Sequence, residues 1–236
     1  MKRGGERMSK NRVPQCAECS LPVRERVCLS PEGKSSKGCP TVSNRKLQEK
    51  ARKEYHKKGI AEFARQASIQ EGECYLNREK KPFMMHPSKP RIQEICEFAS
   101  KMKYTRLGVI SCIGLSREAA VVAQIFEAQG FEVVSVVCKA GSVPKEEIDV
   151  KEHQKIRIGE YEPMCNPIYQ AMLVNEAATD LNVMLGLCVG HDALFFKYAH
   201  APTTVLAVKD RLLGHNPLAA IYTSDTFYAR LKRKGF

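Results

Sequence analysis

Three apolar runs that each end in a cysteine are the feature that most constrains the fold of this chain of 236 residues. The runs are RLGVISC (106–112), EVVSVVC (132–138) and LNVMLGLC (181–188), and TTVLAVKD (203–210) adds a fourth run. Continuous apolar runs that alternate with helical patterns are typical of parallel strands buried on both faces. The sequence therefore predicts an α/β fold with a doubly wound, mostly parallel sheet of about four to five strands.

The segments between these runs read as helices with clear start and stop signals. Ser116 is expected to cap the helix REAAVVAQIFEAQ, which Gly130 ends, and Ser88 to cap a helix that runs to about residue 103. Asn166 and Pro167 provide an N-cap and a first helical residue for IYQAMLVNEAATD. Neither a G-x-G-x-x-G fingerprint nor a P-loop follows the first strand, which counts against a dehydrogenase or an NTPase.

The strand-end cysteines are predicted to meet at one edge of the sheet. In a doubly wound sheet the first strand is commonly central, so Cys138, Cys112 and Cys188 would end three adjacent strands at the carboxyl edge, where such folds bind ligands. Cys165 precedes a helix that starts at the same edge. Four thiolates could hold an iron–sulfur cluster or a second zinc ion, with a redox role in view. The alternative is that these cysteines are small apolar core residues.

Polar residues that follow the third and fourth runs form a second candidate set. His191, three residues after Cys188, could be a further metal ligand or a general acid–base group. Basic groups at this edge could hold a small anionic substrate of a metal-dependent enzyme. The alternative is an internal network that only fixes the loop, and Asp192 can instead cap the short helix ALFFKYA. The predicted catalytic set is His191, Asp192, Lys209, Arg211 and His215.

A separate cysteine cluster near the N-terminus has the composition of a metal site. Its spacing is Cys16-x2-Cys19-x8-Cys28-x10-Cys39, in a stretch rich in proline and glycine. The x2 pair can grip one tetrahedral ion, and a bound ion supplies folding energy that so polar a segment lacks. We expect a structural zinc ion here; the alternative is four free thiols in an irregular segment.

The distribution of charge and the number of cysteines limit which binding partners and which cellular compartment are expected. Residues 1–60 hold 16 Lys or Arg and 6 Asp or Glu, which places +10 of the net charge of +12 there. This segment could contact nucleic acid, but Tyr55 is its one aromatic residue, so nucleic acid ranks last among the partners. No apolar run is long enough to span a bilayer, and ten cysteines without a secretory signal favour the cytoplasm. The expected modules are a basic cysteine-rich helical module, 1–87, and an α/β domain, 88–236.

Two strings resemble a known family. CNPIYQAMLVNEAATDLNVMLGLCVGHD (165–192) and KDRLLGHNP (209–217) are similar to an uncharacterised prokaryotic family of unknown function, eighteen-forty-seven in the usual series. Proteins of that family are commonly labelled metal-binding, and the resemblance extends to the N-terminal cysteines. It implies a cysteine-rich metal-binding protein and no established reaction.

Three function classes follow. The first is a cytoplasmic protein that binds zinc or an iron–sulfur cluster at the sheet edge, with a redox partner. The second is a metal-dependent enzyme that acts on a small anionic ligand. The third is a zinc-containing module that binds nucleic acid or protein. Whether the chain is an enzyme stays open at this point.

Overall fold

The structure is a computed structural model, and it describes residues 13–235. It divides into two compact units, Met1–Ser68 and Ile69–Phe236. Compactness does not test which parts fold independently, so the expected modules 1–87 and 88–236 stay a prediction. The first twelve residues of the basic N-terminal segment lie outside the described residues.

The first unit consists of short helical turns followed by longer helices. The turns η2 (Cys16–Glu18) and η3 (Val23–Glu25) precede α1 (Pro40–Ser43) and α2 (Arg45–Tyr55), and α3 (Ile60–Glu73) runs on into the second unit. Gly59, with φ of +83°, lies between α2 and α3. No residue of α2 is buried, which fits its basic composition.

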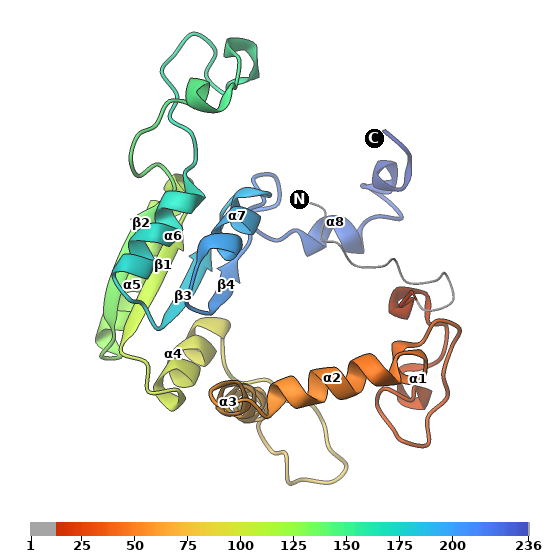
Figure 1. The fold of residues 1–236 in the computed structure, drawn as a ribbon. Helices are drawn as coiled ribbons and strands as arrows, with labels where there is room; N and C mark the ends of the chain where they lie inside the picture. The colour runs from red at the N-terminus through yellow and green to blue at the C-terminus, as the bar shows by residue number, and fades with distance from the viewer. Residues whose placement is uncertain (1–12, 236) are drawn as a thin grey trace. The chain divides into compact units, whose positions relative to one another are not determined.

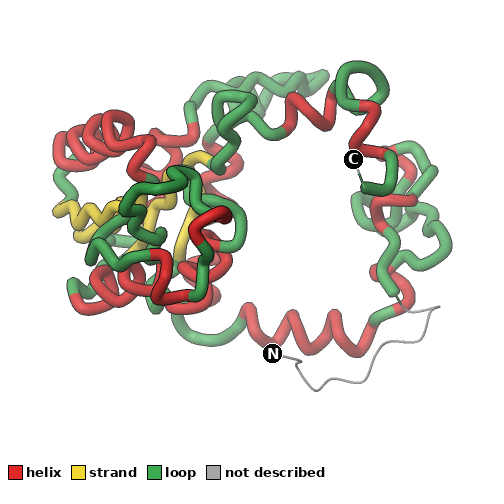
Figure 2. The backbone as a smooth tube through the Cα atoms, turned by 90° about the horizontal axis from the view of Figure 1, so that it is seen from above, coloured by secondary structure: helices red, strands yellow, loops and turns green. Residues whose placement is uncertain are grey.

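A four-stranded parallel sheet organises the second unit (Figure 1; Figure 2 shows the strands in yellow). Its strands are β1 (Arg106–Ser111), β2 (Glu132–Val137), β3 (Leu181–Leu185) and β4 (Thr203–Ala207). Their order is β2-β1-β3-β4, and all neighbours are parallel. The first strand is therefore central, as predicted, and the strand order reverses between β1 and β3. That reversal is where open α/β sheets bind ligands, beyond the carboxyl ends of the strands.

Helices cover both faces of the sheet, which confirms the doubly wound arrangement. One core lies on the side of α4 (Arg91–Lys101) and α5 (Ser116–Ala128), with Phe126 at its centre. The other lies on the side of α6 (Pro167–Glu176) and α7 (His191–Tyr198), with Phe195 at its centre. Because the strands are buried from both sides, they read in the sequence as apolar runs without alternation.

Of three N-cap residues predicted from the sequence, the structure confirms one and differs at two. The side chain of Asn166 accepts a hydrogen bond of 3.1 Å from the N–H of Tyr169, so it caps α6 as predicted. Ser88 does not cap α4, because its hydroxyl donates to the carbonyl of Cys74 and α4 begins at Arg91. Ser116 is the first residue of α5 rather than its cap, and its hydroxyl donates to the carbonyl of Ile113.

The polar segment between β2 and α6, residues 139–164, forms a compact insertion beyond the sheet (green in Figure 1). Two short turns, η5 (Lys145–Ile148) and η6 (Glu152–Gln154), are held by ion pairs. Lys145 lies 2.5 Å from Glu162, and the ammonium of Lys155, whose side chain is 4% exposed, pairs with Glu146 and Glu152. The insertion is thus a folded element and not a loose loop.

After β4 the chain forms a loop and then short helical segments. These are α8 (Leu218–Tyr222) and η7 (Ala229–Lys232). Over the part of the chain that the structure describes, none of the helices is long and apolar enough to cross a membrane.

Candidate metal and thiol site

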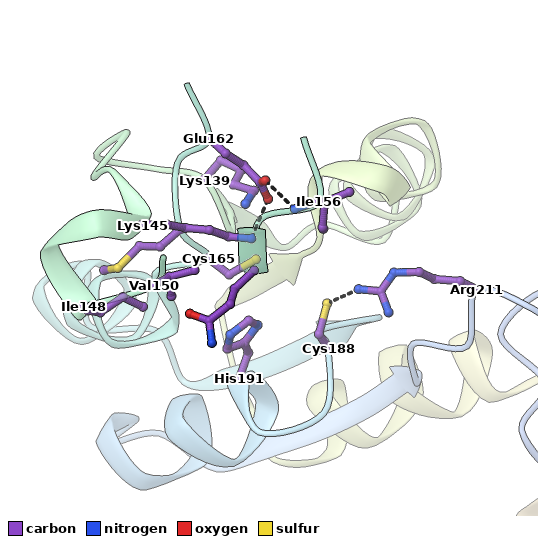
Figure 3. Close-up of a pocket in the computed structure, with 12 residues that line it drawn as sticks. Lys139, Lys145, Ile148, Val150, Ile156, Glu162, Cys165, Cys188, His191 and Arg211 are labelled. Atoms are coloured by element: carbon purple, nitrogen blue, oxygen red, sulfur yellow. Dashed lines mark hydrogen bonds and ion pairs between the residues drawn. The ribbon is translucent and has the colours of Figure 1, made fainter. Parts of the chain in front are cut away.

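A pocket of about 430 Å³ lies between the insertion and the carboxyl edge of the sheet (Figure 3). Cys165, Cys188 and His191 line it from the sheet side. The insertion contributes basic and apolar side chains, and Arg211 comes from the loop after β4. The pocket therefore lies where the topology of the sheet predicts a ligand site.

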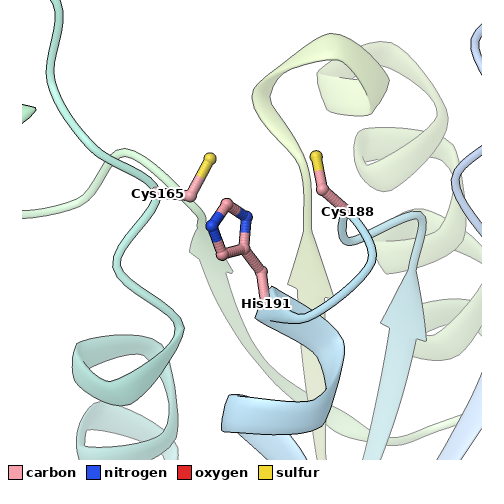
Figure 4. Close-up of side chains that lie close together, drawn as sticks. All are labelled: Cys165, Cys188 and His191. Carbon is pink, nitrogen blue, oxygen red and sulfur yellow. The ribbon is translucent and has the colours of Figure 1, made fainter. Parts of the chain in front are cut away.

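The ligand atoms of Cys165, Cys188 and His191 all lie within 4.8 Å of one another (Figure 4). Cys165 stands two residues before α6, and Cys188 lies in the turn between β3 and α7, of which His191 is the first residue. The carbonyl of Cys188 accepts the N–H of His191 at 3.0 Å, which ties the cysteine to the start of the helix. Among the described residues, this is the one group of three or more metal-ligating side chains with such close approach.

Cys112 and Cys138 lie next to this group, at the ends of β1 and β2. Ser111 pairs with Val137 in the ladder, and the N–H of Cys138 donates to the carbonyl of Ser111 at 2.8 Å. The two cysteines therefore follow matching positions of neighbouring strands, and both side chains are buried in the core that includes α6. The N–H of Ile113 donates to the sulfur of Cys138 at 3.4 Å. The structure thus brings Cys112, Cys138, Cys165 and Cys188 close together at the carboxyl edge of the sheet, and these four are called the strand-edge cysteines. Their role as ligands stays a prediction.

Hydrogen bonds among the thiols separate their pKa values. The thiol of Cys138 contacts both neighbouring sulfurs, and these two contacts, together with burial, raise its pKa. The hydrogen bond from Cys138 lowers the pKa of Cys165, and the charges of Lys139 and His191 lower it further. The pKa of Cys112 falls because of its bond with Cys138, a backbone N–H at Gly114 and the ammonium of Lys209. The two thiols that bond to Cys138, those of Cys112 and Cys165, thus favour the thiolate form that metals require.

Cys188 has a different environment. Burial raises the pKa of its thiol, while the charge of Arg211 acts in the opposite direction. The guanidinium of Arg211 donates a hydrogen bond of 2.8 Å to the sulfur. A cation that donates to a ligating sulfur is the kind of outer contact that holds metal ligands in place.

The chemistry of the donor set fits a metal ion. The Nδ1 atom of His191 is buried and has no hydrogen-bond partner in the described part of the chain, which is costly for a ring nitrogen unless a ligand satisfies it. A tetrahedral zinc ion with Zn–S bonds of about 2.3 Å holds its ligand atoms about 3.8 Å apart. The observed approach within 4.8 Å requires a closure of only about 1 Å.

The remaining members of the predicted catalytic set fall into two groups. Arg211 lines the pocket with His191, and Lys209 lies beside Cys112. Asp192 instead accepts the N–H groups of Gly190 and Ala193, inside the first turn of α7. The ring of His215 accepts the N–H of Asp210 at 3.1 Å and serves the loop after β4. The structure thus brings part of this set to the pocket and uses the rest to fix turns.

The four N-terminal cysteines lie in the first unit. Cys16, Cys19, Cys28 and Cys39 line one cavity of about 50 Å³. Hydrogen bonds from Ser36 and from the backbone of Leu21 lower the pKa of the Cys19 thiol. Their sulfurs do not form a close group like that of Cys165, Cys188 and His191 within the residues that the structure describes.

Several pocket residues of the insertion were not predicted from the sequence. Lys145 and Glu162 come from turns without regular periodicity, and so do Ile148, Val150 and Ile156. The one sequence signal was the string KEEIDVKEHQK (145–155), in which opposite charges recur at spacings of one to four residues. Such spacing predicts local ion pairs but does not show which side chains will face a pocket.

Comparison with known proteins places the chain in a family. A profile described as "Protein of unknown function (DUF1847)" matches residues 39–206. The chain belongs to DUF1847. The matched region contains all of the strand-edge cysteines and His191, whereas Cys16, Cys19, Cys28 and Arg211 lie outside it. The resemblance to a family of unknown function is thus confirmed.

A curated protein is also similar to this chain. "Uncharacterized protein MJ0455" of Methanocaldococcus jannaschii is 45% identical over 172 residues, which cover 73% of this chain and 86% of that protein. No solved structure matches the chain.

Proposed function

We propose that this chain is a metal-binding protein whose sheet-edge site holds one divalent ion, zinc in the first instance, through Cys165, Cys188 and His191. The observation that carries the proposal is the mutual approach of these three ligand atoms within 4.8 Å. Two thiolates and one imidazole form a donor set that suits zinc. The lowered pKa of the Cys165 thiol and the unpartnered Nδ1 of His191 support it.

Three protein ligands leave one coordination position free. Zinc sites of this kind activate a bound water or polarise a carbonyl, whereas structural sites use four protein ligands. The free position would face the pocket, where Arg211 and Lys139 provide positive charge. This arrangement supports a metal-dependent reaction on a small anion ahead of a purely structural role.

The sulfur-rich surroundings support an iron–sulfur cluster as the second candidate. Cys138 contacts both Cys112 and Cys165, and the sulfur of Cys188 lies within 4.8 Å of that of Cys165. Four thiolates in one neighbourhood are the usual ligand set of such clusters, and a cluster would give the site a redox role. It would use Cys112 and Cys138 in place of His191.

The proposal includes a second metal site, formed by the N-terminal cysteines. We assign a structural zinc ion to Cys16, Cys19, Cys28 and Cys39, because one small cavity is lined by all of them. All ten cysteines of the chain lie among the described residues and are free thiols, which supports residence in a reducing compartment such as the cytoplasm.

Metal quantification on protein purified without oxygen tests the assignment. The full chain should hold two zinc equivalents, and Cys188→Ser should hold one, while Cys96→Ser should hold two. Cys96 is a matched control because it is a buried cysteine on α4, in the core on the opposite face of the sheet. A brown protein with absorbance near about 400 nm would replace zinc by a cluster. Equal metal content in all three proteins would remove Cys188 from the site.

A further inference from the structure

We propose that the pocket over the Cys165–Cys188–His191 group binds a small amphipathic carboxylate, with its charged end at Arg211 and its apolar chain against the insertion. The inference deepens the proposed function, since one carboxylate oxygen would take the free metal position. It also stands on features of the pocket that are independent of any metal, namely its size, its charge and its apolar wall.

The size and lining of the pocket suit a small organic ligand. Its volume of about 430 Å³ falls within the usual range for small-molecule sites, roughly 300–1,000 Å³. Its apolar wall comes from the insertion and consists of Ile148, Val150, Ile156 and Met164. Ile148 is 55% exposed and Ile156 80% exposed, so both leave apolar surface in water that a ligand can cover.

The side chains that line the pocket carry more positive than negative charge. Lys145 lies 2.5 Å from Glu162, so this pair cancels. Lys139 donates to the carbonyl of Pro163 and contacts Cys165, and Arg211 donates to Cys188. Two thiolates would be neutralised by a divalent ion, which leaves the charges of Lys139 and Arg211 for an anion.

Arg211 is the residue best suited to hold the charged end. One of its nitrogens donates to Cys188, and the planar guanidinium carries further N–H donors in a fixed fork. That fork matches a carboxylate, whose two oxygens can accept parallel hydrogen bonds. Because Arg211 bonds a proposed metal ligand directly, a carboxylate held by the fork would lie next to the metal position.

Part of the apolar wall lies away from Arg211. In Figure 3, Ile148 and Val150 lie at one side and Arg211 at the other, with Cys165, His191 and Cys188 between them, whereas Ile156 lies on the side of Arg211. A ligand that spans the pocket therefore needs an anionic end and an apolar end. A short-chain carboxylate has this form, whereas inorganic phosphate would use only the charged side.

Calorimetric titration of the cobalt-loaded protein with straight-chain carboxylates from acetate to hexanoate tests the inference. Each added methylene should lower the Kd about fourfold, because burying one CH₂ contributes roughly 0.8 kcal/mol. Arg211→Gln should weaken every member at least tenfold. Ile148→Ser should flatten the dependence on chain length and leave acetate unchanged. Ile158→Ser is the control, since Ile158 is an exposed isoleucine of the same insertion that does not line the pocket.

The outcomes separate this inference from the proposed function. Cobalt binding without any carboxylate binding, or without dependence on chain length, would overturn the carboxylate pocket and leave the metal site. Tighter binding of inorganic phosphate than of hexanoate would also overturn it. Carboxylate binding with the expected dependence in protein that takes up no metal at the sheet edge would support the pocket and refute the proposed metal site.

Discussion

The guanidinium of Arg211 donates a hydrogen bond of 2.8 Å to the sulfur of Cys188, so the loop after β4 contacts the turn after β3. This contact links a residue outside the DUF1847 match to one inside it. If Cys188 ligates a metal, Arg211 acts as an outer partner that orients the sulfur and stabilises its negative charge.

Replacing Arg211 should therefore weaken metal binding. Arg211→Met keeps an unbranched side chain and removes the donor, and we expect a loss of about 10- to 100-fold in zinc affinity, as for other outer partners of metal ligands. Competition with a chromophoric chelator measures this affinity. Arg157→Met is the control, because Arg157 is an exposed arginine of the insertion whose side chain pairs with Glu160. Equal affinities of the two variants would show that the contact has no part in metal binding.

The location of this site could largely be predicted from the sequence, whereas the side chains that form it could not. The apolar runs indicated parallel strands, and Gly130, Asn166 and Pro167 marked helix ends, because these signals act over a few residues. The central position of β1 followed from the usual topology of such sheets. Which side chains meet depends on turns, and turn geometry is set by tertiary contacts.

Two residues illustrate this limit. Asp192 stood beside His191 in the sequence, which allowed it either a catalytic role or a role at the start of a short helix. In the structure its carboxylate accepts backbone N–H groups within the turn, while His191 faces the cysteines. Likewise, nothing in the spacing of residues 139–164 showed that Lys145 would enter the pocket. The side-chain direction at a loop or at the start of a helix cannot be read from periodicity.

Acid should loosen the insertion through Glu162. The hydrogen bond from Lys145 and the backbone N–H groups of Arg157 and Ile156 outweigh burial and lower the pKa of this carboxyl to about 2. A carboxyl with a lowered pKa in the folded state stabilises the fold above its unfolded pKa, which is about 4.3, and loses that effect as the pH falls toward about 2.

Hydrogen exchange at residues 144–163 measures this effect. Protection should fall between about pH 4.5 and pH 2.5, in the window set by these two pKa values. In Glu162→Gln the protection should be low already at neutral pH and change less with acid. The strands of the sheet serve as an internal reference. A pH dependence that is unchanged in Glu162→Gln would assign the effect to other carboxylates, such as Glu146 and Glu152.

A methyl group at Gly186 should destabilise the turn that carries Cys188. Gly186 has φ of +69°, and a Cβ atom there would lie 2.3 Å from Cδ1 of the buried Leu115. Gly130→Ala is the matched control, since Gly130 has φ of +89° and open space around the same position. Both alanines cost about 1–2 kcal/mol for a left-handed backbone, and Gly186→Ala should cost about 1–3 kcal/mol more for overpacking.

Urea unfolding of the two glycine variants gives these free energies. We expect Gly186→Ala to be the less stable protein and to lose metal affinity as well, because its turn leads to Cys188. Gly130→Ala should keep the affinity of the unsubstituted chain. Equal free energies of unfolding would mean that Leu115 moves aside without cost.

X-ray absorption at the zinc edge tests the central claim most directly. The sample is the full chain with Cys16→Ser and Cys19→Ser, which removes the N-terminal site and leaves the sheet-edge site as the source of the signal. The account predicts a first shell of two sulfurs at about 2.3 Å and two lighter atoms at about 2.0–2.2 Å, from Cys165, Cys188, His191 and the ligand in the free position. A shell of four sulfurs, or no bound zinc in this protein, would contradict it.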